Sequence, residues 1–79
     1  MDQKKSILII DDHPVFRDGL KTAIALDNRF KVVGEAENAR QGLRMSRKYQ
    51  PDIIVMAISL PDKSGIELTR EIRSLSSKT

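Results

Sequence analysis

Two adjacent acidic residues, Asp11 and Asp12, directly follow the apolar run of residues 7–10. Like charges this close repel each other, and partial burial further disfavours their ionised forms. A hard divalent cation such as Mg²⁺ removes that penalty, because it prefers carboxylate and water oxygens as ligands. In the structural alternative, one acid caps the following helix and the other is solvated. The pair therefore indicates either an acidic metal or phosphate site or a helix start.

The acidic pair must be positioned by the elements around it. Three short apolar segments, within residues 7–10, 30–36 and 53–58, predict strands, and the first and third are apolar enough to be buried on both faces. The segments between and after them predict helices, with start signals at Pro14, at Asn38 with Gln41, and at Ser64 with Glu67. We expect the first helix to stop near Asp27-Asn28 and the second at Gln50-Pro51.

Apolar stripes at helical spacing support two of these helices. They are Phe16, Leu20, Ala23 and Ile24 in the first and Leu68, Ile72 and Leu75 in the third. Alternating strands and helices predict an α/β fold with a parallel sheet covered by helices. In such open sheets, ligands bind beyond the carboxyl ends of the strands. The acidic pair lies at one of these ends.

Composition limits the classes of protein that remain. The chain has 79 residues, a net charge of +3 and no cysteine, which excludes disulfides and thiolate chemistry. Its apolar runs are far shorter than a membrane span, and the start of the chain does not read as a signal peptide. We therefore expect a soluble cytoplasmic protein that contacts no membrane.

Two segments resemble a known family. Asp11-Asp12 followed by residues 13–20, HPVFRDGL, is similar to the start of a bacterial response-regulator receiver domain, and most similar to the NarL/FixJ branch with a LuxR-type output domain. Residues 51–65, PDIIVMAISLPDKSG, resemble the family segment around the phosphorylated aspartate. The resemblance extends over residues 6–75. It implies a flavodoxin-like (CheY-like) fold with strand order 2-1-3-4-5.

The resemblance also implies that residues 1–79 are an incomplete receiver domain. The chain supplies three strands and three helices, so the last two strands and the DNA-binding output domain would be absent. By the same resemblance, a fourth strand should begin just after Thr79. The implied partners of the parent protein are a sensor histidine kinase and, through the output domain, DNA.

Ala57 stands where the family has its phosphoacceptor aspartate. A methyl group has no lone pair and cannot attack a phosphohistidine, so the chain is expected to be non-phosphorylatable and to have no catalytic residue. The residue is either engineered to block phosphorylation or natural, as in a pseudo-receiver, and the intact surrounding pattern favours the first. The resemblance implies Mg²⁺ ligands at Asp11, Asp12 and the main-chain carbonyl of Ser59. Ala57 removes a further carboxylate, so the metal should bind weakly or not at all.

Other residues allow other interpretations. Ser59 and Asp62 are substitute acceptors only on weak grounds, because Ser59 lacks a visible base and Asp62 is a turn residue. His13 is the only histidine, so local hydrogen bonding at the helix start is favoured over metal binding. A basic face on the second helix could bind nucleic acid, although a solvated face is favoured; its residues are Arg40, Arg44, Arg47 and Lys48.

Three functional hypotheses follow. The first, which we favour, is a signalling module and not an enzyme. The second is a phosphorylation-independent pseudo-receiver that acts in protein interaction or dimerisation, pairing through an exposed sheet edge or by swapped elements. The third is a phosphatase that uses Asp11 and Asp12, which is disfavoured because such enzymes place the second acid two residues beyond the first.

Overall fold

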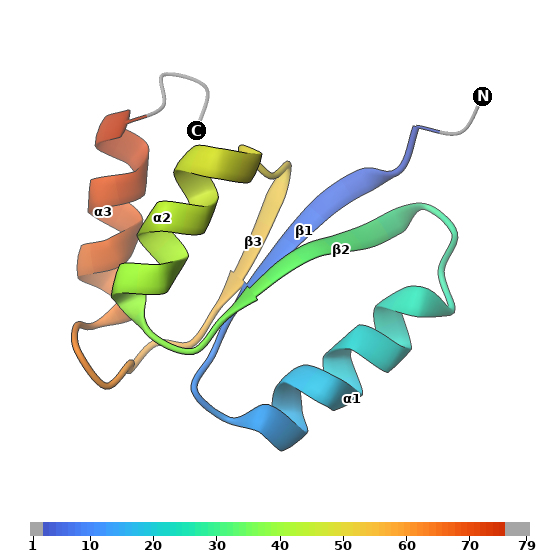
Figure 1. Ribbon diagram of the computed structural model, residues 1–79, viewed down its shortest axis with the longest axis horizontal. Helices are drawn as coiled ribbons and strands as arrows, with labels where there is room; N and C mark the ends of the chain where they lie inside the picture. The colour runs from blue at the N-terminus through green and yellow to red at the C-terminus, as the bar shows by residue number, and fades with distance from the viewer. Residues whose placement is uncertain (1–2, 76–79) are drawn as a thin grey trace.

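The computed structural model describes the backbone of residues 3–75 and the side chains of residues 3–74. Strands and helices alternate throughout this part of the chain (Figure 1). The elements are β1 (Lys5–Ile10), α1 (Pro14–Ala25), β2 (Phe30–Ala36), α2 (Ala39–Tyr49), β3 (Ile53–Met56) and α3 (Gly65–Leu75). The predicted α/β order is confirmed. The side chain of Leu75 and the fourth strand expected after Thr79 lie outside the described residues.

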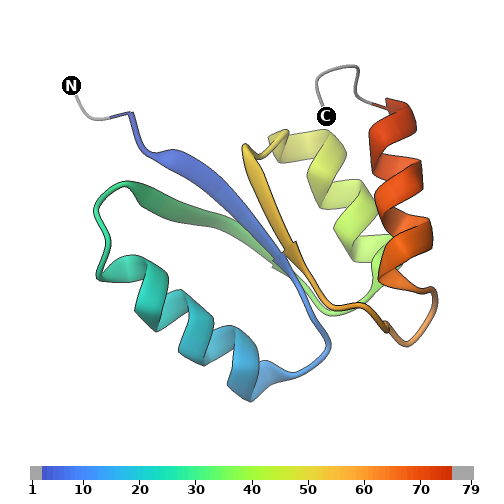
Figure 2. The same ribbon diagram turned by 180° about the vertical axis from the view of Figure 1, so that it is seen from behind.

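All three strands are parallel, and β1 lies between the other two in the order β2-β1-β3 (Figure 2). The side chains of Ile7 to Ile10 are all buried, which confirms the prediction of a strand covered on both faces. The third strand is shorter than predicted, since it ends at Met56 and Ile58 is 78% exposed. The prediction that it is buried on both faces is wrong, because β3 is at the edge of the described sheet and none of its residues is buried. The strand order places the carboxyl ends of β1 and β3 side by side.

A hydrogen-bonded clamp fixes the opposite end of the β1–β3 pair. One carboxylate oxygen of Asp52 accepts bonds from the amide of Ser6 at 2.8 Å and from its hydroxyl at 3.1 Å. The amide of Asp52 in turn donates to the hydroxyl and to the carbonyl of Ser6, both at 3.0 Å. The amide and hydroxyl bonds from Ser6 lower the pKa of Asp52. The clamp sets the register of the two strands, because slipping by one residue breaks all four bonds.

A β-bulge interrupts the other pair. Ile7 lies opposite Val32 and Leu8 opposite Gly34, so Val33 has no partner on β1. Beyond this extra residue, Glu35 lies opposite Ile9 and Ala36 opposite Ile10. Paired residues of a parallel sheet face the same side, so the bulge decides which side of the sheet Glu35 occupies.

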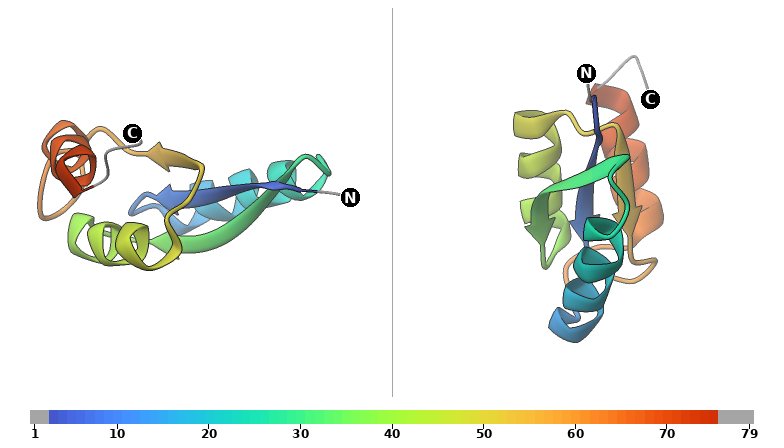
Figure 3. Two further views of the ribbon diagram at one scale, coloured as in Figure 1. Left: turned by 90° about the horizontal axis from the view of Figure 1, so that it is seen from above. Right: turned by 90° about the vertical axis from the view of Figure 1, so that its right-hand side faces the viewer.

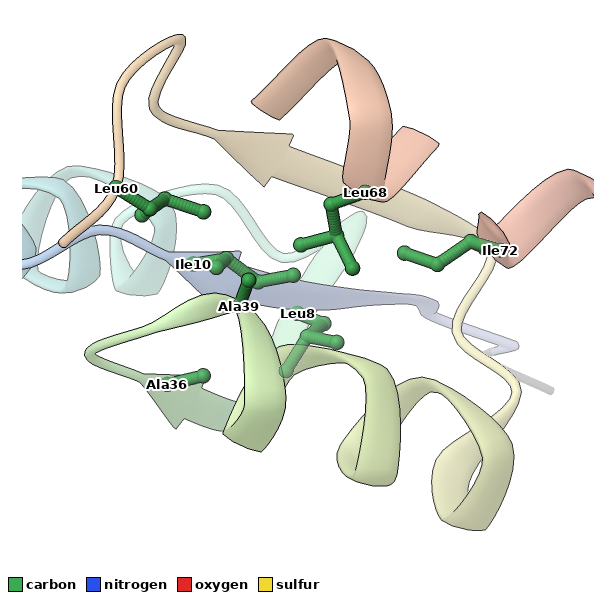
Figure 4. Close-up of a cluster of buried hydrophobic side chains, with 7 residues drawn as sticks. All are labelled: Leu8, Ile10, Ala36, Ala39, Leu60, Leu68 and Ile72. Atoms are coloured by element: carbon green, nitrogen blue, oxygen red, sulfur yellow. The ribbon is translucent and has the colours of Figure 1, made fainter. Parts of the chain in front are cut away.

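Helices α2 and α3 lie side by side, away from α1 (Figure 3), and the main hydrophobic core lies between them and the sheet (Figure 4). Strand β1 contributes Leu8 and Ile10, which point to this side because alternate strand residues share a face. The other buried members are Ala36, Ala39, Leu60, Leu68 and Ile72. Gly42 lets α2 lie close to the sheet, since a Cβ there would come within 2.6 Å of the Ile10 side chain.

Among residues 3–75, α1 alone covers the opposite face, and the cover is thin. The predicted apolar stripe of α1 is present, but α1 has no buried residue and Phe16 remains 51% exposed. Amphipathic spacing shows which side of a helix is apolar, and it does not show that neighbouring elements enclose that side. No helix within residues 3–75 is long and apolar enough to cross a membrane.

The helix boundaries follow local chemistry. Pro14 opens α1, and the Asn38 side chain accepts from the amide of Gln41 at 2.8 Å at the start of α2. The hydroxyl of Ser64 accepts from the amide of Glu67 at 3.1 Å at the start of α3. Helix α2 ends where Gln50, the residue before Pro51, adopts a left-handed conformation with φ 45°. Helix α1 ends earlier than expected, at Ala25, through a right-handed Leu26.

We expect Gly65→Ala to lower the free energy of unfolding by about 1–3 kcal/mol, because the added Cβ would overlap the main-chain oxygen of Ala57. Urea unfolding followed by circular dichroism measures the change. Gly19→Ala is the matched control, since its Cβ would meet no atom within 4 Å. That variant should gain up to about 1 kcal/mol from helix propensity. Equal stability of Gly65→Ala and the parent would contradict the close approach.

Candidate functional site

The acidic pair lies where the three strands end. The amide of Asp11 donates to the carbonyl of Ala36 at 2.9 Å, and the amide of Ala57 donates to the carbonyl of Ile10, also at 2.9 Å. The carboxyl ends of β1, β2 and β3 are thus joined directly at one edge of the sheet. The structure therefore brings Ala57 beside the Asp11–Asp12 segment, as the strand order implied by the resemblance predicts.

Asp11 is buried and is held within its own turn. Its Oδ1 atom accepts a hydrogen bond from the amide of His13 at 2.8 Å and lies at the same distance from the His13 ring nitrogen Nδ1. A carboxylate that bonds to the backbone two residues ahead closes a local turn. The main-chain carbonyl of Asp11 accepts from Nη1 of Arg17 at 2.6 Å. Asp11 thus closes the turn that precedes α1 and does not cap the helix, since the N-terminus of α1 has no side-chain cap bond among the described residues.

Asp12 behaves differently. Its Oδ1 atom is buried and has no hydrogen-bond donor among the described residues. Nδ1 of His13 lies 3.2 Å away but makes its hydrogen bond with Asp11. The hydrogen bond with Asp11 raises the pKa of His13, and the charge of Asp12 raises it further. The Asp12 side chain is 33% exposed, but its buried Oδ1 atom has no donor within residues 3–75, and such an oxygen suits a bound cation.

The three side chains form one potential ligand set. One oxygen each from Asp11 and Asp12 and one ring nitrogen of His13 lie within 4.8 Å of one another. Two carboxylates offer the hard oxygen ligands that Mg²⁺ prefers. His13 is exposed and forms the local hydrogen bond that the sequence predicted. The donor chemistry of Asp11 and Asp12 therefore fits the expected metal.

Ala57 and Ser59 follow β3 on this edge. Ala57 is half-buried and packs against the main hydrophobic core. Ser59 lies two residues further along, in a short antiparallel bridge with Ser64. The bridge and the bond from the Gly65 amide to the Ile58 carbonyl, 2.6 Å long, close the loop between β3 and α3. As a result, the first residue of α3, Gly65, lies beside Ala57.

Asp62 has a role that sequence analysis missed. Its two carboxylate oxygens accept from the amides of Ala39 at 2.8 Å and Arg40 at 3.0 Å, at the start of α2. A negative charge is favourable there because free amides and the helix dipole converge. These bonds, that from Ala39 most strongly, lower the pKa of Asp62. The carboxylate is thus engaged in a cap between distant segments, which disfavours it as a substitute acceptor.

The basic face of α2 is present as the sequence indicated. Arg40, Arg44, Arg47 and Lys48 are all exposed, and none of them has an acidic partner in the part of the chain that the structure describes. Lys48 lies 5.3 Å from the centre of the Tyr49 ring. This geometry accords with a solvated helix face and offers no stacking surface beyond Tyr49.

Comparison with known proteins agrees with this geometry. The transcriptional regulatory protein DegU of Brevibacillus brevis is 39% identical over 71 residues, which is 90% of this chain and 30% of DegU. A solved LuxR-family response regulator from an Aurantimonas species is 38% identical, with a TM-score of 0.91 over 98% of this chain and 55% of that one. The solved signal receiver domain of the putative response regulator NarL from Mycobacterium tuberculosis is 30% identical, with a TM-score of 0.89 over 92% of this chain and 59% of that one.

A three-stranded parallel sheet with helices on both faces and an acidic pair at its carboxyl edge defines a CheY-like receiver fold. Residues 7–79 match the family of response regulator receiver domains, and the chain belongs to that family. The resemblance to the NarL and LuxR group is confirmed. The chain spans about a third of the curated relatives that it matches.

We expect Asp62→Asn to destabilise the chain at neutral pH, because the amide keeps an acceptor but removes the charge at the start of α2. Asp62 has a lowered pKa in the folded chain, so its ionised form stabilises the fold at any pH above the usual value of 3.8. This contribution is lost as the pH falls below 3.8 through the folded-state pKa.

Urea unfolding of both chains between about pH 2 and 7 tests this linkage. The difference in unfolding free energy should be constant at neutral pH and shrink in acid. The difference between the two chains isolates Asp62 from the other carboxyls that titrate there. A difference that is the same at every pH would show that the charge of Asp62 contributes nothing.

Proposed function

We propose that the chain is the N-terminal part of the receiver domain of a two-component response regulator, in a form that cannot be phosphorylated. The observation that carries the proposal is Ala57, whose amide is bonded to the end of β1 beside the acidic pair. The position adjoins the carboxylates, and the side chain has no nucleophilic atom. The share of the solved receiver domain that this chain covers, 59%, supports the incomplete domain.

Asp11, Asp12 and the main-chain carbonyl of Ser59 would hold Mg²⁺. The ion, when bound, would offset negative charge on a phosphoryl group near the strand ends. Asp11 is prearranged by its turn, and Asp12 offers an unpaired oxygen. With Ala57 no further carboxylate completes the set, so binding should be weak.

The proposed partners of the parent protein are a sensor histidine kinase and, through an output domain, DNA. DegU is a transcriptional regulatory protein, and the output role is proposed from that relationship. The same relationship favours signalling over catalysis. A cytoplasmic location remains a prediction that follows from the family.

Incubation with an acyl phosphate and Mg²⁺ should add no phosphoryl group to this chain, as measured by intact-protein mass spectrometry. A boiled chain sets the background. The variant Ala57→Asp should restore the acceptor carboxylate without restoring full transfer, since the expected fourth and fifth strands would supply further groups. Phosphate uptake by the Ala57 chain above the boiled background would refute the proposal.

Mg²⁺ should stabilise the parent chain less than the Ala57→Asp variant. A third carboxylate adds repulsion that the ion relieves, so the variant should lose more stability when Mg²⁺ is removed. Thermal unfolding with Mg²⁺ and with a chelator measures both differences. An equal change of unfolding temperature in the two chains when Mg²⁺ is removed would contradict the role given to the Asp11–Asp12 metal site.

A second candidate function is protein interaction without phosphorylation. In residues 3–75, β3 pairs with β1 alone, and the apolar stripe of α1 is incompletely covered. An exposed strand edge offers unpaired backbone groups to another chain. Light scattering over a concentration series tests this function: a discrete dimer supports it, and a monomer at every concentration excludes self-association through this edge.

A further inference from the structure

Arg17 connects three elements beneath the acidic pair. Its side chain projects from the first turns of α1 and is only 16% exposed. Nη1 donates to the main-chain carbonyl of Asp11 at 2.6 Å, and Nε donates to Oε1 of Glu35 on β2 at 3.1 Å. The guanidinium group therefore joins the end of β1, the end of β2 and the start of α1.

Glu35 holds the guanidinium group in place. Its second carboxylate oxygen accepts from Nζ of Lys21 at 2.8 Å, so two cations share one acid. The hydrogen bond from Lys21, followed by that from Arg17, lowers the pKa of Glu35. The β-bulge at Val33 places Glu35 opposite Ile9, on the side of the sheet where α1 lies. The planar fork of Arg17 donates to these two acceptors in fixed directions, whereas the ammonium group of a lysine is a point charge on a flexible stem.

The carbonyl that Arg17 binds belongs to the peptide bond between Asp11 and Asp12. A planar peptide moves as a unit, so fixing its oxygen also fixes the backbone on both sides of it. The backbone torsions on the two sides of this peptide set the direction of the Asp11 carboxylate relative to that of Asp12. The amide of His13, which closes the turn onto Asp11, depends on the same backbone.

We propose that Arg17 is a positioning residue for the metal site: braced by Glu35, it holds the Asp11–Asp12 peptide so that both carboxylates converge on one cation. This inference rests on the proposed Mg²⁺ site and assigns a role to a residue outside the ligand set. Groups that orient metal ligands typically change affinity by about 10–100-fold when they are removed.

The sign of the effect distinguishes positioning from charge. Arg17 carries a positive charge close to the site, so electrostatics alone predicts that its removal strengthens Mg²⁺ binding. Loss of positioning predicts the opposite. Arg17→Met, which keeps the apolar stem, should therefore weaken Mg²⁺ binding by about tenfold or more.

Lys21→Met is the matched control. It removes the same charge and the same kind of bond to Glu35, and the structure gives Lys21 no bond to Asp11. This variant should bind Mg²⁺ as tightly as the parent or slightly more tightly. Arg17→Lys keeps the positive charge and loses the planar fork, so weaker Mg²⁺ binding in that variant reports lost positioning and not lost charge. It also provides the test if Arg17→Met does not fold.

Two readouts decide the proposal on the ¹⁵N-labelled 79-residue chain. Mg²⁺ titrations followed through the amide signals of Asp12 and His13 give the dissociation constants. Hydrogen exchange of the His13 amide, measured without metal, reports the turn itself and should accelerate in both Arg17 variants but not in Lys21→Met. Unchanged or tighter Mg²⁺ binding together with unchanged His13 exchange would overturn the role of Arg17.

If the parent chain binds no Mg²⁺, the metal site of the proposed function fails, and the exchange of the His13 amide still decides whether Arg17 holds the turn. Faster exchange in the Arg17 variants alone supports positioning. Equal exchange in all variants refutes it. The two proposals therefore fail in distinguishable ways.

Discussion

Every strand pairing within the described sheet involves β1. Both neighbours bond to it, its four apolar residues are buried, and it ends in the acidic pair. Because β1 is central, one short run of Ile and Leu lies at the middle of the sheet, contributes Leu8 and Ile10 to the main core and leads directly into the carboxylates. The site exists because β1 and β3 end together, which places Ala57 against the end of β1.

Features encoded by neighbouring residues could be predicted from the sequence. Pro14 opens α1 because it lacks the N–H that the first turn leaves unbonded, and Asn38 and Ser64 open α2 and α3 by accepting from an amide of the first turn. The strand order followed from the resemblance, and the proximity of the acidic pair to Ala57 followed from that strand order. The helix starts needed only local patterning, whereas the strand order and the position of Ala57 needed the resemblance.

Interactions between distant segments could not be predicted. Asp62 caps a helix that begins 23 residues earlier, and Arg17 meets Glu35 only because a bulge on β2 turns that side chain toward α1. No spacing rule connects such positions, because the folded sheet brings them together. The exposure of α1 was missed for a related reason: a stripe of apolar residues gives no information about how much of it the rest of the chain encloses.

The clamp between Ser6 and Asp52 also bears on how the chain folds. It joins residues 46 positions apart, whereas the partner of Lys5 on β2, Phe30, is much closer in sequence. Doubling the length of a loop adds only about 0.6 kcal/mol to the entropic free-energy cost of closing it, which corresponds to about a threefold slower closure. Chain entropy alone therefore barely distinguishes which neighbour joins β1 first or on which edge. The four-bond clamp on one edge and the bulge on the other give the two edges different chemical identities, so that each accepts one partner in one register.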